Sequence, residues 1–188
     1  MTIFSNGNPV VERRRTKGFT LVEMMVVVVL LGMASAMMMP TMVFFSKSML
    51  GVGNYSLMSA QSRTALEIFS RDLHVAEVLT AASQAGVSMT LPADLDSAVV
   101  VYTYDANAKE LVRSVTPSGG STKSRTLFGD VHSFEFVYYN RLGVDVSADA
   151  SILSESKSVQ INAKLLKDVG VIDNTDYIIS ARFLMRNI

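Results

Sequence analysis

The stretch Lys17-Gly18-Phe19-Thr20-Leu21-Val22-Glu23 is followed at once by a long apolar run, and together they decide the fold of the N-terminal part of the chain. Four basic residues stand on its N-terminal side, at positions 13, 14, 15 and 17. Glu23 heads a segment that carries no charge from Met24 to Ser46. About 20 apolar residues span a bilayer as a helix, so residues 24–45 predict a transmembrane helix. A carboxylate at the head of that helix is costly in hydrocarbon unless a partner compensates it.

This pattern resembles the class III signal of type IV prepilins and type II secretion pseudopilins, which reads Gly-Phe-Thr-Leu-hydrophobic-Glu. The resemblance implies that prepilin peptidase cuts between Gly18 and Phe19 on the cytoplasmic side and then methylates the new amino group of Phe19. Glu23 becomes the fifth residue of the mature chain, where this family carries its glutamate. Pro40 falls where many members have a helix-kinking proline. Because proline lacks the amide hydrogen, we expect a kink or local melting there.

Three simpler targeting signals also fit parts of this region. The apolar run with its basic flank could be an ordinary signal anchor with a cytoplasmic N-terminus. Ala34-Ser35-Ala36 could be the cleavage site of a conventional secretory signal, cut after Ala36. The arginine run is similar to a twin-arginine signal, but Thr16-Lys17-Gly18 lacks the apolar residues expected after the pair. None of the three accounts for Glu23, and the prepilin signal does.

Composition limits what the rest of the chain can be. The 188 residues include 17 basic and 17 acidic side chains; the leader holds four of the basic ones and Glu12, which leaves 13 basic and 16 acidic. The chain without its leader is thus mildly acidic, and its sequence shows no run of basic residues that would indicate a basic patch. We therefore expect no nucleic acid partner. The chain has no cysteine, so its folded domain depends on its core alone. It also lacks the disulfide-closed C-terminal loop that the resemblance associates with major pilins.

The periodicity of the sequence divides the chain into four parts. We expect a cleaved leader (1–18), a membrane-spanning and assembly helix (19–46), an amphipathic stem helix (47–86) and a β-rich head domain (87–188). The stem has apolar residues at three- and four-residue steps from Met58 to Ala76. Strands are predicted at 99–104, 110–115, 133–139, 159–165 and 177–185, with a hairpin turn at 105–108. The predicted fold class is α+β: a long helix packed on an antiparallel sheet of about four to five strands, which is the type IV pilin fold.

Parts of the later sequence resemble the minor pilin and pseudopilin J branch of the family. The points of similarity are Arg71-Asp72-Leu73 near the helix end, the strand from Val131 to Phe136, the strand from Ser158 to Ala163, and the ending from Arg182 to Asn187. They favour a minor subunit that initiates or caps a type IV pilus or a type II secretion pseudopilus. The alternatives are a binding module on such a filament, for adhesion, DNA uptake or capture of a secreted protein, and a major filament subunit.

The resemblance also implies partners and a location. The partners are prepilin peptidase, other pilins or pseudopilins, an inner-membrane assembly platform and membrane lipid. The chain is expected to cross the inner membrane once, with its head domain in the periplasm or outside. During assembly Glu23 is expected to pair with the Phe19 amine of an adjacent subunit.

Little in the sequence points to catalysis. His74 and His132 are far apart, and the loop 117–121 lacks the glycine spacing and the lysine of a phosphate-binding loop. Two aspartate pairs, at 94 and 96 and at 145 and 149, could be imagined as calcium ligands. Neither has the dense alternating oxygen pattern of a calcium loop. We therefore expect a chain that is the substrate of an enzyme and not an enzyme, with no cofactor and no metal.

Overall fold

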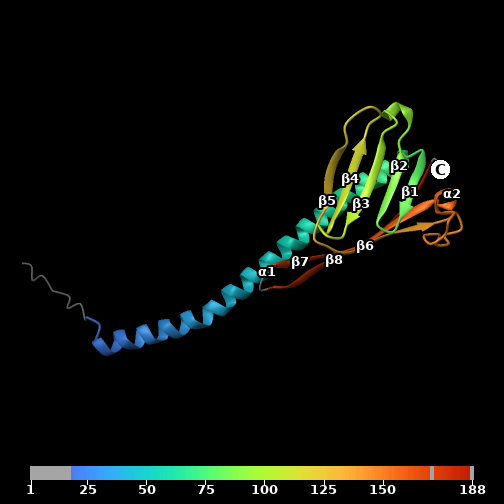
Figure 1. The fold of residues 1–188 in the computed structure, drawn as a ribbon. Coiled ribbons are helices and arrows are strands. Elements are labelled where there is room, and N and C mark those ends of the chain that lie inside the picture. The colour runs from blue at the N-terminus through green and yellow to red at the C-terminus, as the bar shows by residue number, and fades with distance from the viewer. Residues whose placement is uncertain (1–17, 170–171, 187–188) are drawn as a thin grey trace, which may run out of the picture. The chain divides into compact units, whose positions relative to one another are not determined.

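The computed structural model describes residues 18–169 and 172–186, and Figure 1 shows them as a ribbon. The chain divides into two compact units, one that ends at Ser46 and one that begins at Lys47. Helix α1 (Leu21–Val75) runs through both, and every described strand belongs to the second. The second unit is thus an α+β domain, as the sequence predicts.

Helix α1 contains the predicted membrane-spanning segment and continues through Pro40. The β-branched run Val26–Val29 is helical here, although such residues are common in strands. Proline removes one backbone donor and crowds the preceding turn. The local melting expected at Pro40 does not occur, because the surrounding residues keep a continuous helix. A kink at Pro40 remains a prediction.

The C-terminal end of α1 differs from the prediction of a stem that reaches residue 86. The helix ends at Val75, and strand β1 (Val78–Ser83) follows after two residues. β1 pairs antiparallel with β2 (Gly86–Thr90), so that Gln84-Ala85 is the turn of a hairpin and not the end of a helix. The stretch from Ala76 to Ser83 is compatible with helix or strand on local preference alone. The pairing with β2, which is a tertiary contact, decides between them.

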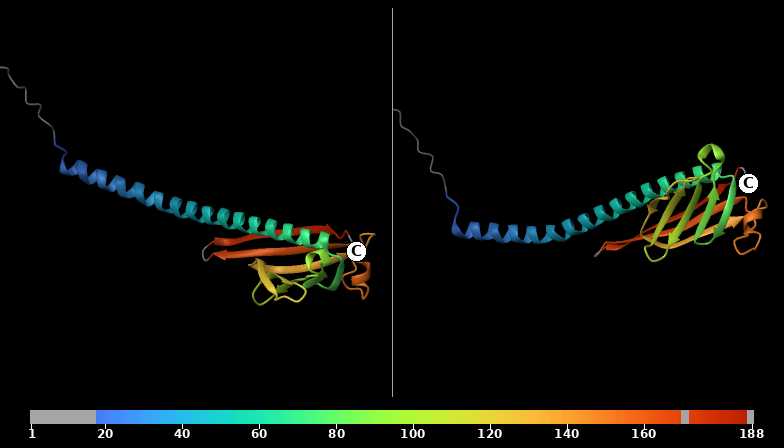
Figure 2. Two further views of the ribbon diagram at one scale, coloured as in Figure 1. Left: turned by 90° about the horizontal axis from the view of Figure 1, so that it is seen from above. Right: turned by 45° about the horizontal axis from the view of Figure 1, so that its top comes forward.

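The first sheet is an antiparallel meander in which sequential strands are neighbours, in the order β1-β2-β3-β4-β5 (Figure 2, right). Its further strands are β3 (Val99–Asp105), β4 (Glu110–Thr116) and β5 (Lys123–Phe128), and the short helix η1 (Ala93–Leu95) precedes β3. The predicted turn at 105–108 is present between β3 and β4. There the Asp105 carboxylate accepts hydrogen bonds from the backbone amides of Asn107 and Ala108 (2.8 and 3.0 Å).

The second sheet has the order β6-β7-β8. Its strands are β6 (Val131–Tyr139), β7 (Ser158–Val169) and β8 (Ile172–Leu184), and the short helix α2 (Ile152–Glu155) lies between β6 and β7 in the chain. All five predicted strands are present, as β3, β4, β6, β7 and β8. The predicted fold class, a long helix packed on an antiparallel sheet of about four to five strands, is confirmed, and the structure adds a second sheet to it. The predicted strands do not include β1, β2 and β5, of which β5 is a mostly exposed edge strand without an apolar alternation.

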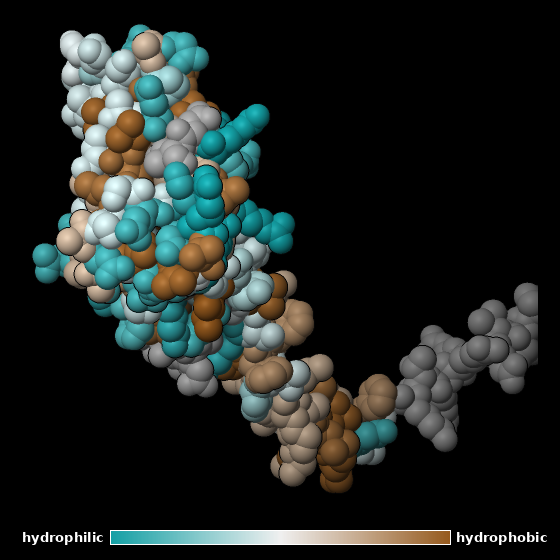
Figure 3. Space-filling model, turned by 90° about the vertical axis from the view of Figure 1, so that its right-hand side faces the viewer, coloured by the Kyte–Doolittle hydropathy of each residue, from teal (hydrophilic) through white to brown (hydrophobic). Residues whose placement is uncertain are grey.

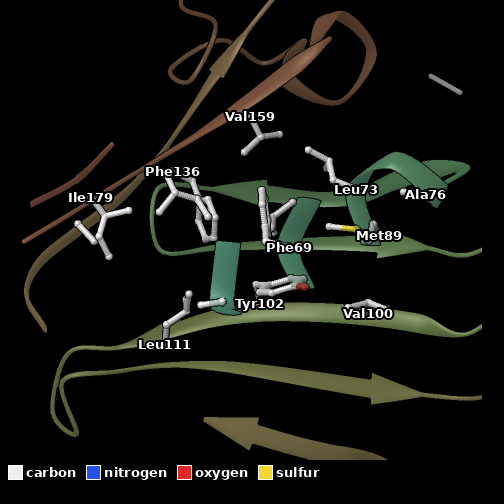
Figure 4. Packing of buried hydrophobic residues seen from close by; sticks show 14 of the residues in the cluster. Phe69, Leu73, Ala76, Met89, Val100, Tyr102, Leu111, Phe136, Val159 and Ile179 are labelled. Atoms are coloured by element: carbon white, nitrogen blue, oxygen red, sulfur yellow. The ribbon is translucent and has the colours of Figure 1, made fainter. Parts of the chain in front are cut away.

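Phe69 of α1 lies at the centre of the core, where it joins the helix to both sheets (Figure 4). Its ring is fully buried and contacts Tyr102 of β3 edge-on, with ring centroids 5.0 Å apart. It also contacts Phe136 of β6 (5.8 Å) and Phe183 of β8 (5.5 Å). Burial of a large apolar side chain contributes about 1.5–3 kcal/mol. The C-terminal part of α1 is therefore the element on which both sheets pack.

Candidate processing and assembly site

The first turn of α1 brings together the residues of the predicted signal. Gly18, Phe19 and Thr20 precede the helix, and all three are exposed. The Thr20 hydroxyl accepts a hydrogen bond from the backbone amide of Glu23 (3.2 Å), and the Thr20 carbonyl accepts one from the amide of Met24 (3.1 Å). Thr20 is thus the N-cap of α1. Sequence reasoning missed this role, although Thr20-Leu21-Val22-Glu23 has the spacing of a capping box.

Glu23 lies in the first helical turn. A carboxylate is favourable there, because the free amides of the first turn and the helix dipole place partial positive charge at this end. No basic side chain lies within ion-pair distance of Glu23 among residues 18–169 and 172–186. In the described part of the molecule, therefore, the charge is offset by its own helix end and by no ion pair.

The peptide bond predicted to be cleaved is accessible. A Cβ atom built on Gly18 meets nothing within 4 Å, and the Phe19 side chain is 76% exposed. The basic residues at positions 13, 14, 15 and 17 lie outside the described residues. The structure thus shows the carboxyl side of the predicted bond as an exposed segment directly before a capped helix.

The helix after Glu23 exposes mostly apolar side chains, part of which are visible on the face that Figure 3 shows. Every residue from Met24 to Phe45 is exposed within its own unit. By length and composition, α1 is able to cross a membrane. Since exposed apolar area on this scale is unfavourable in water, the segment requires lipid or protein around it.

The remaining candidates from the sequence do not converge on a chemical site. His74 of α1 contacts the Ser70 hydroxyl (3.2 Å), and His132 is an exposed residue of β6. Asp145 accepts hydrogen bonds from Ser147, and these hold the pKa of its carboxyl below the usual value. Among the residues described, no three His, Cys, Asp or Glu side chains gather as metal ligands.

One buried polar cluster was not foreseen as a unit. Asp72 of α1 is 5% exposed, and its Oδ2 atom accepts hydrogen bonds from the Tyr102 hydroxyl and from Nε of Arg113, both at 2.6 Å. Burial raises the pKa of Tyr102, and the charge of Asp72 raises it further. Burial by itself lowers the pKa of Arg113, but the hydrogen bond and charge of Asp72 outweigh it, so that pKa lies above its ordinary value. The cluster ties α1 to β3 and β4.

The fold and the N-terminal segment define a class of protein: an α+β domain carried on a long helix whose first part is a candidate membrane anchor. The family model of the prokaryotic N-terminal methylation motif matches residues 13–39. The chain therefore carries the class III signal of a prepilin peptidase substrate, and the match supports its assignment to the type IV pilin and pseudopilin family. The match does not confirm the J-like subtype. No curated protein matches the chain.

Proposed function

We propose that the chain is a minor pilin or pseudopilin, which helps to initiate or cap a type IV pilus or a type II secretion pseudopilus. Prepilin peptidase cuts it between Gly18 and Phe19 and methylates the Phe19 amine. The anchor lies in the inner membrane, the head domain lies in the periplasm or outside, and an assembly platform moves the subunit from lipid into the filament. The observation that carries this proposal is Glu23, a carboxylate that heads an exposed apolar helix within a class III signal.

The assembly step follows from the electrostatics of that helix end. The helix dipole offsets only part of the cost of a carboxylate in a low-dielectric environment. A second subunit offers the missing charge, because cleavage creates an amine at Phe19. Two charges that are each costly alone stabilise one another when they meet in the right register. The pair then sets the register of the subunits, and packing of residues 24–45 supplies cohesion.

Two further parts of the proposal concern the role of the subunit. A minor role is supported by the absence of cysteine from the sequence, since the resemblance associates major pilins with a disulfide-closed loop. A major subunit would instead dominate filaments sheared from cells. We also propose that the chain performs no catalysis, because its two histidines are on separate elements and the sequence offers no cysteine nucleophile.

The first experiment determines the N-terminus of the membrane-bound protein by mass spectrometry, in cells with and without prepilin peptidase. We expect a chain that starts at N-methylated Phe19 and is lost without the peptidase. The Gly18→Asp variant should keep its leader. A start at Met37, or an intact leader in both strains, would refute processing as a prepilin.

The second experiment separates processing from assembly. Glu23→Ala should be cleaved and methylated normally but incorporated poorly, because loss of about 1.4 kcal/mol per subunit contact already lowers occupancy tenfold. Glu67→Ala is the matched control, since Glu67 is an exposed carboxylate of α1 beyond the apolar segment. Quantitative immunoblotting of sheared filaments against whole cells measures both variants. Normal incorporation of Glu23→Ala would contradict the charge-pair mechanism.

A further inference from the structure

The fold gathers basic residues that are far apart in the sequence around one open pocket. The pocket has a volume of about 440 Å³ and lies where the end of β6, the start of β7 and the end of β8 meet. Arg141, Lys157, Arg182 and Arg186 line it, and no Asp or Glu does. The net charge of the chain does not reveal this cluster. Its members come from three separate segments of the sequence, which only the fold brings together.

The backbone around the pocket is held in place. The Lys157 amide donates to the Tyr139 carbonyl (2.8 Å), and the Met185 amide donates to the Lys157 carbonyl (2.9 Å), which joins the three strand ends. The loop that carries Arg141 is closed by the Asn140 side chain, which accepts hydrogen bonds from two backbone amides of the same loop. The backbone positions from which the basic side chains extend are thus set before any ligand arrives.

Arg182 is the most constrained of the four. Its guanidinium lies 3.4 Å from the centre of the Tyr139 ring, and its Nε and Nη2 atoms both donate to Oε1 of Gln160 (3.1 Å each). Among the residues whose side chains the structure describes, 18–167 and 176–186, no acidic side chain forms an ion pair with Arg141, Lys157 or Arg182. A fixed, planar guanidinium without a carboxylate partner is suited to bind an anion.

We propose that this pocket binds an acidic segment of another protein, through at least two of its carboxylates. Leu184 is 65% exposed and also lines the pocket, so a segment with an apolar residue among its acidic ones fits it best. The inference stands on the head domain alone and does not depend on the proposed role in a filament.

Two observations favour an acidic protein segment over a nucleic acid. Proteins that bind single strands combine a basic track with free aromatic faces on which bases stack. Here the guanidinium of Arg182 covers a face of the Tyr139 ring, and none of the described residues that line the pocket is aromatic. The whole chain has 17 basic and 17 acidic side chains, and removal of the leader leaves 13 basic and 16 acidic ones. The resulting net negative charge opposes the binding of a long polyanion.

The test uses the full chain in a nonionic detergent, with fluorescein-labelled hexaglutamate as the probe and fluorescence anisotropy as the readout. We expect saturable binding that weakens as salt is added. Arg141→Gln should raise Kd about fivefold, as the loss of one exposed charge contact predicts, and Arg141→Gln with Lys157→Gln about 25-fold. Arg182→Lys should also weaken binding, because it keeps the charge but loses the guanidinium N–H donors that Gln160 does not engage.

The matched control is Lys123→Gln with Arg125→Gln, which removes the same charge from the exposed edge strand β5. Its affinity for hexaglutamate should equal that of the unaltered chain. Equal affinity of the pocket variants and the control would overturn the proposal. Binding of a twelve-residue thymidine oligonucleotide through Arg141 and Lys157, without binding of hexaglutamate, would also overturn it and assign the pocket to nucleic acid. Arg141 is exposed, so Arg141→Gln is expected to fold normally. That variant alone tests the proposal even if Lys157→Gln unfolds.

Discussion

Substitution of Asp72 by alanine tests whether the buried cluster holds α1 against the five-stranded sheet. The change removes the acceptor of two hydrogen bonds, one from the Tyr102 hydroxyl and one from Nε of Arg113. A buried hydroxyl left without an acceptor costs about 1–3 kcal/mol, and a hydrogen bond to a charged group contributes about 1.5–3 kcal/mol. The Arg113 side chain is 22% exposed and regains some hydration. We therefore expect a loss of about 3 kcal/mol in the free energy of unfolding.

Substitutions of the two partners of Asp72, Tyr102 and Arg113, test whether the three side chains act as one cluster. Tyr102→Phe should cost about 1 kcal/mol, since it removes one hydrogen bond and no charge. Arg113→Met should cost about 3 kcal/mol, because it leaves the Asp72 carboxylate buried without its cation. Combining Asp72→Ala with Arg113→Met should cost less than the sum of the two single changes, by about 1–3 kcal/mol, because no unpaired charge remains.

The assay is urea unfolding of the full chain in nonionic detergent, followed by near-ultraviolet circular dichroism. The chain has six tyrosines and no tryptophan, so the signal reports on tyrosine packing. Asp176→Ala is the matched control. It removes a carboxylate from the exposed ion pair of Lys164 and Asp176 (2.8 Å) and should cost less than about 1 kcal/mol. Equal effects of Asp72→Ala and Asp176→Ala, or strictly additive effects of Asp72→Ala and Arg113→Met, would refute the reasoning.

Two further predictions use the same assay. Ser62 is 1% exposed and its hydroxyl has no hydrogen-bond partner among the described residues, so Ser62→Ala should stabilise the domain by about 1 kcal/mol; a loss of stability would point to an unrecognised partner. Burial raises the pKa of Tyr102 and Tyr138 above the ordinary value of 10.0, so the folded state keeps protons that the unfolded state releases. The stability from these two groups is complete below pH 10 and falls above it, by about 1.4 kcal/mol per pH unit for each tyrosine. Tyr138→Phe should halve that slope between pH 10 and 11.5, and an unchanged slope would contradict the assignment.

The sequence by itself determined the features that depend on neighbouring residues. Three such features are the signal around Gly18 and Glu23, the apolar span after it and the five alternating strands. Insertion into a membrane depends on the hydropathy of one contiguous segment. A half-buried strand alternates apolar and polar residues with a period of two, which is visible in a few neighbouring residues. The N-cap at Thr20 was equally local and could have been found from its spacing to Glu23.

Only the tertiary structure decided the features that join distant segments. Helix α1 ends at Val75 because the next residues gain backbone partners in β2, and local preference does not distinguish helix from strand there. Asp72 is buried because Tyr102 and Arg113, 30 and 41 residues away, supply its hydrogen bonds. The basic pocket forms because three strand ends meet. In each case the stabilising free energy comes from contacts between residues that are far apart in the sequence. Patterns among neighbouring residues do not show such contacts.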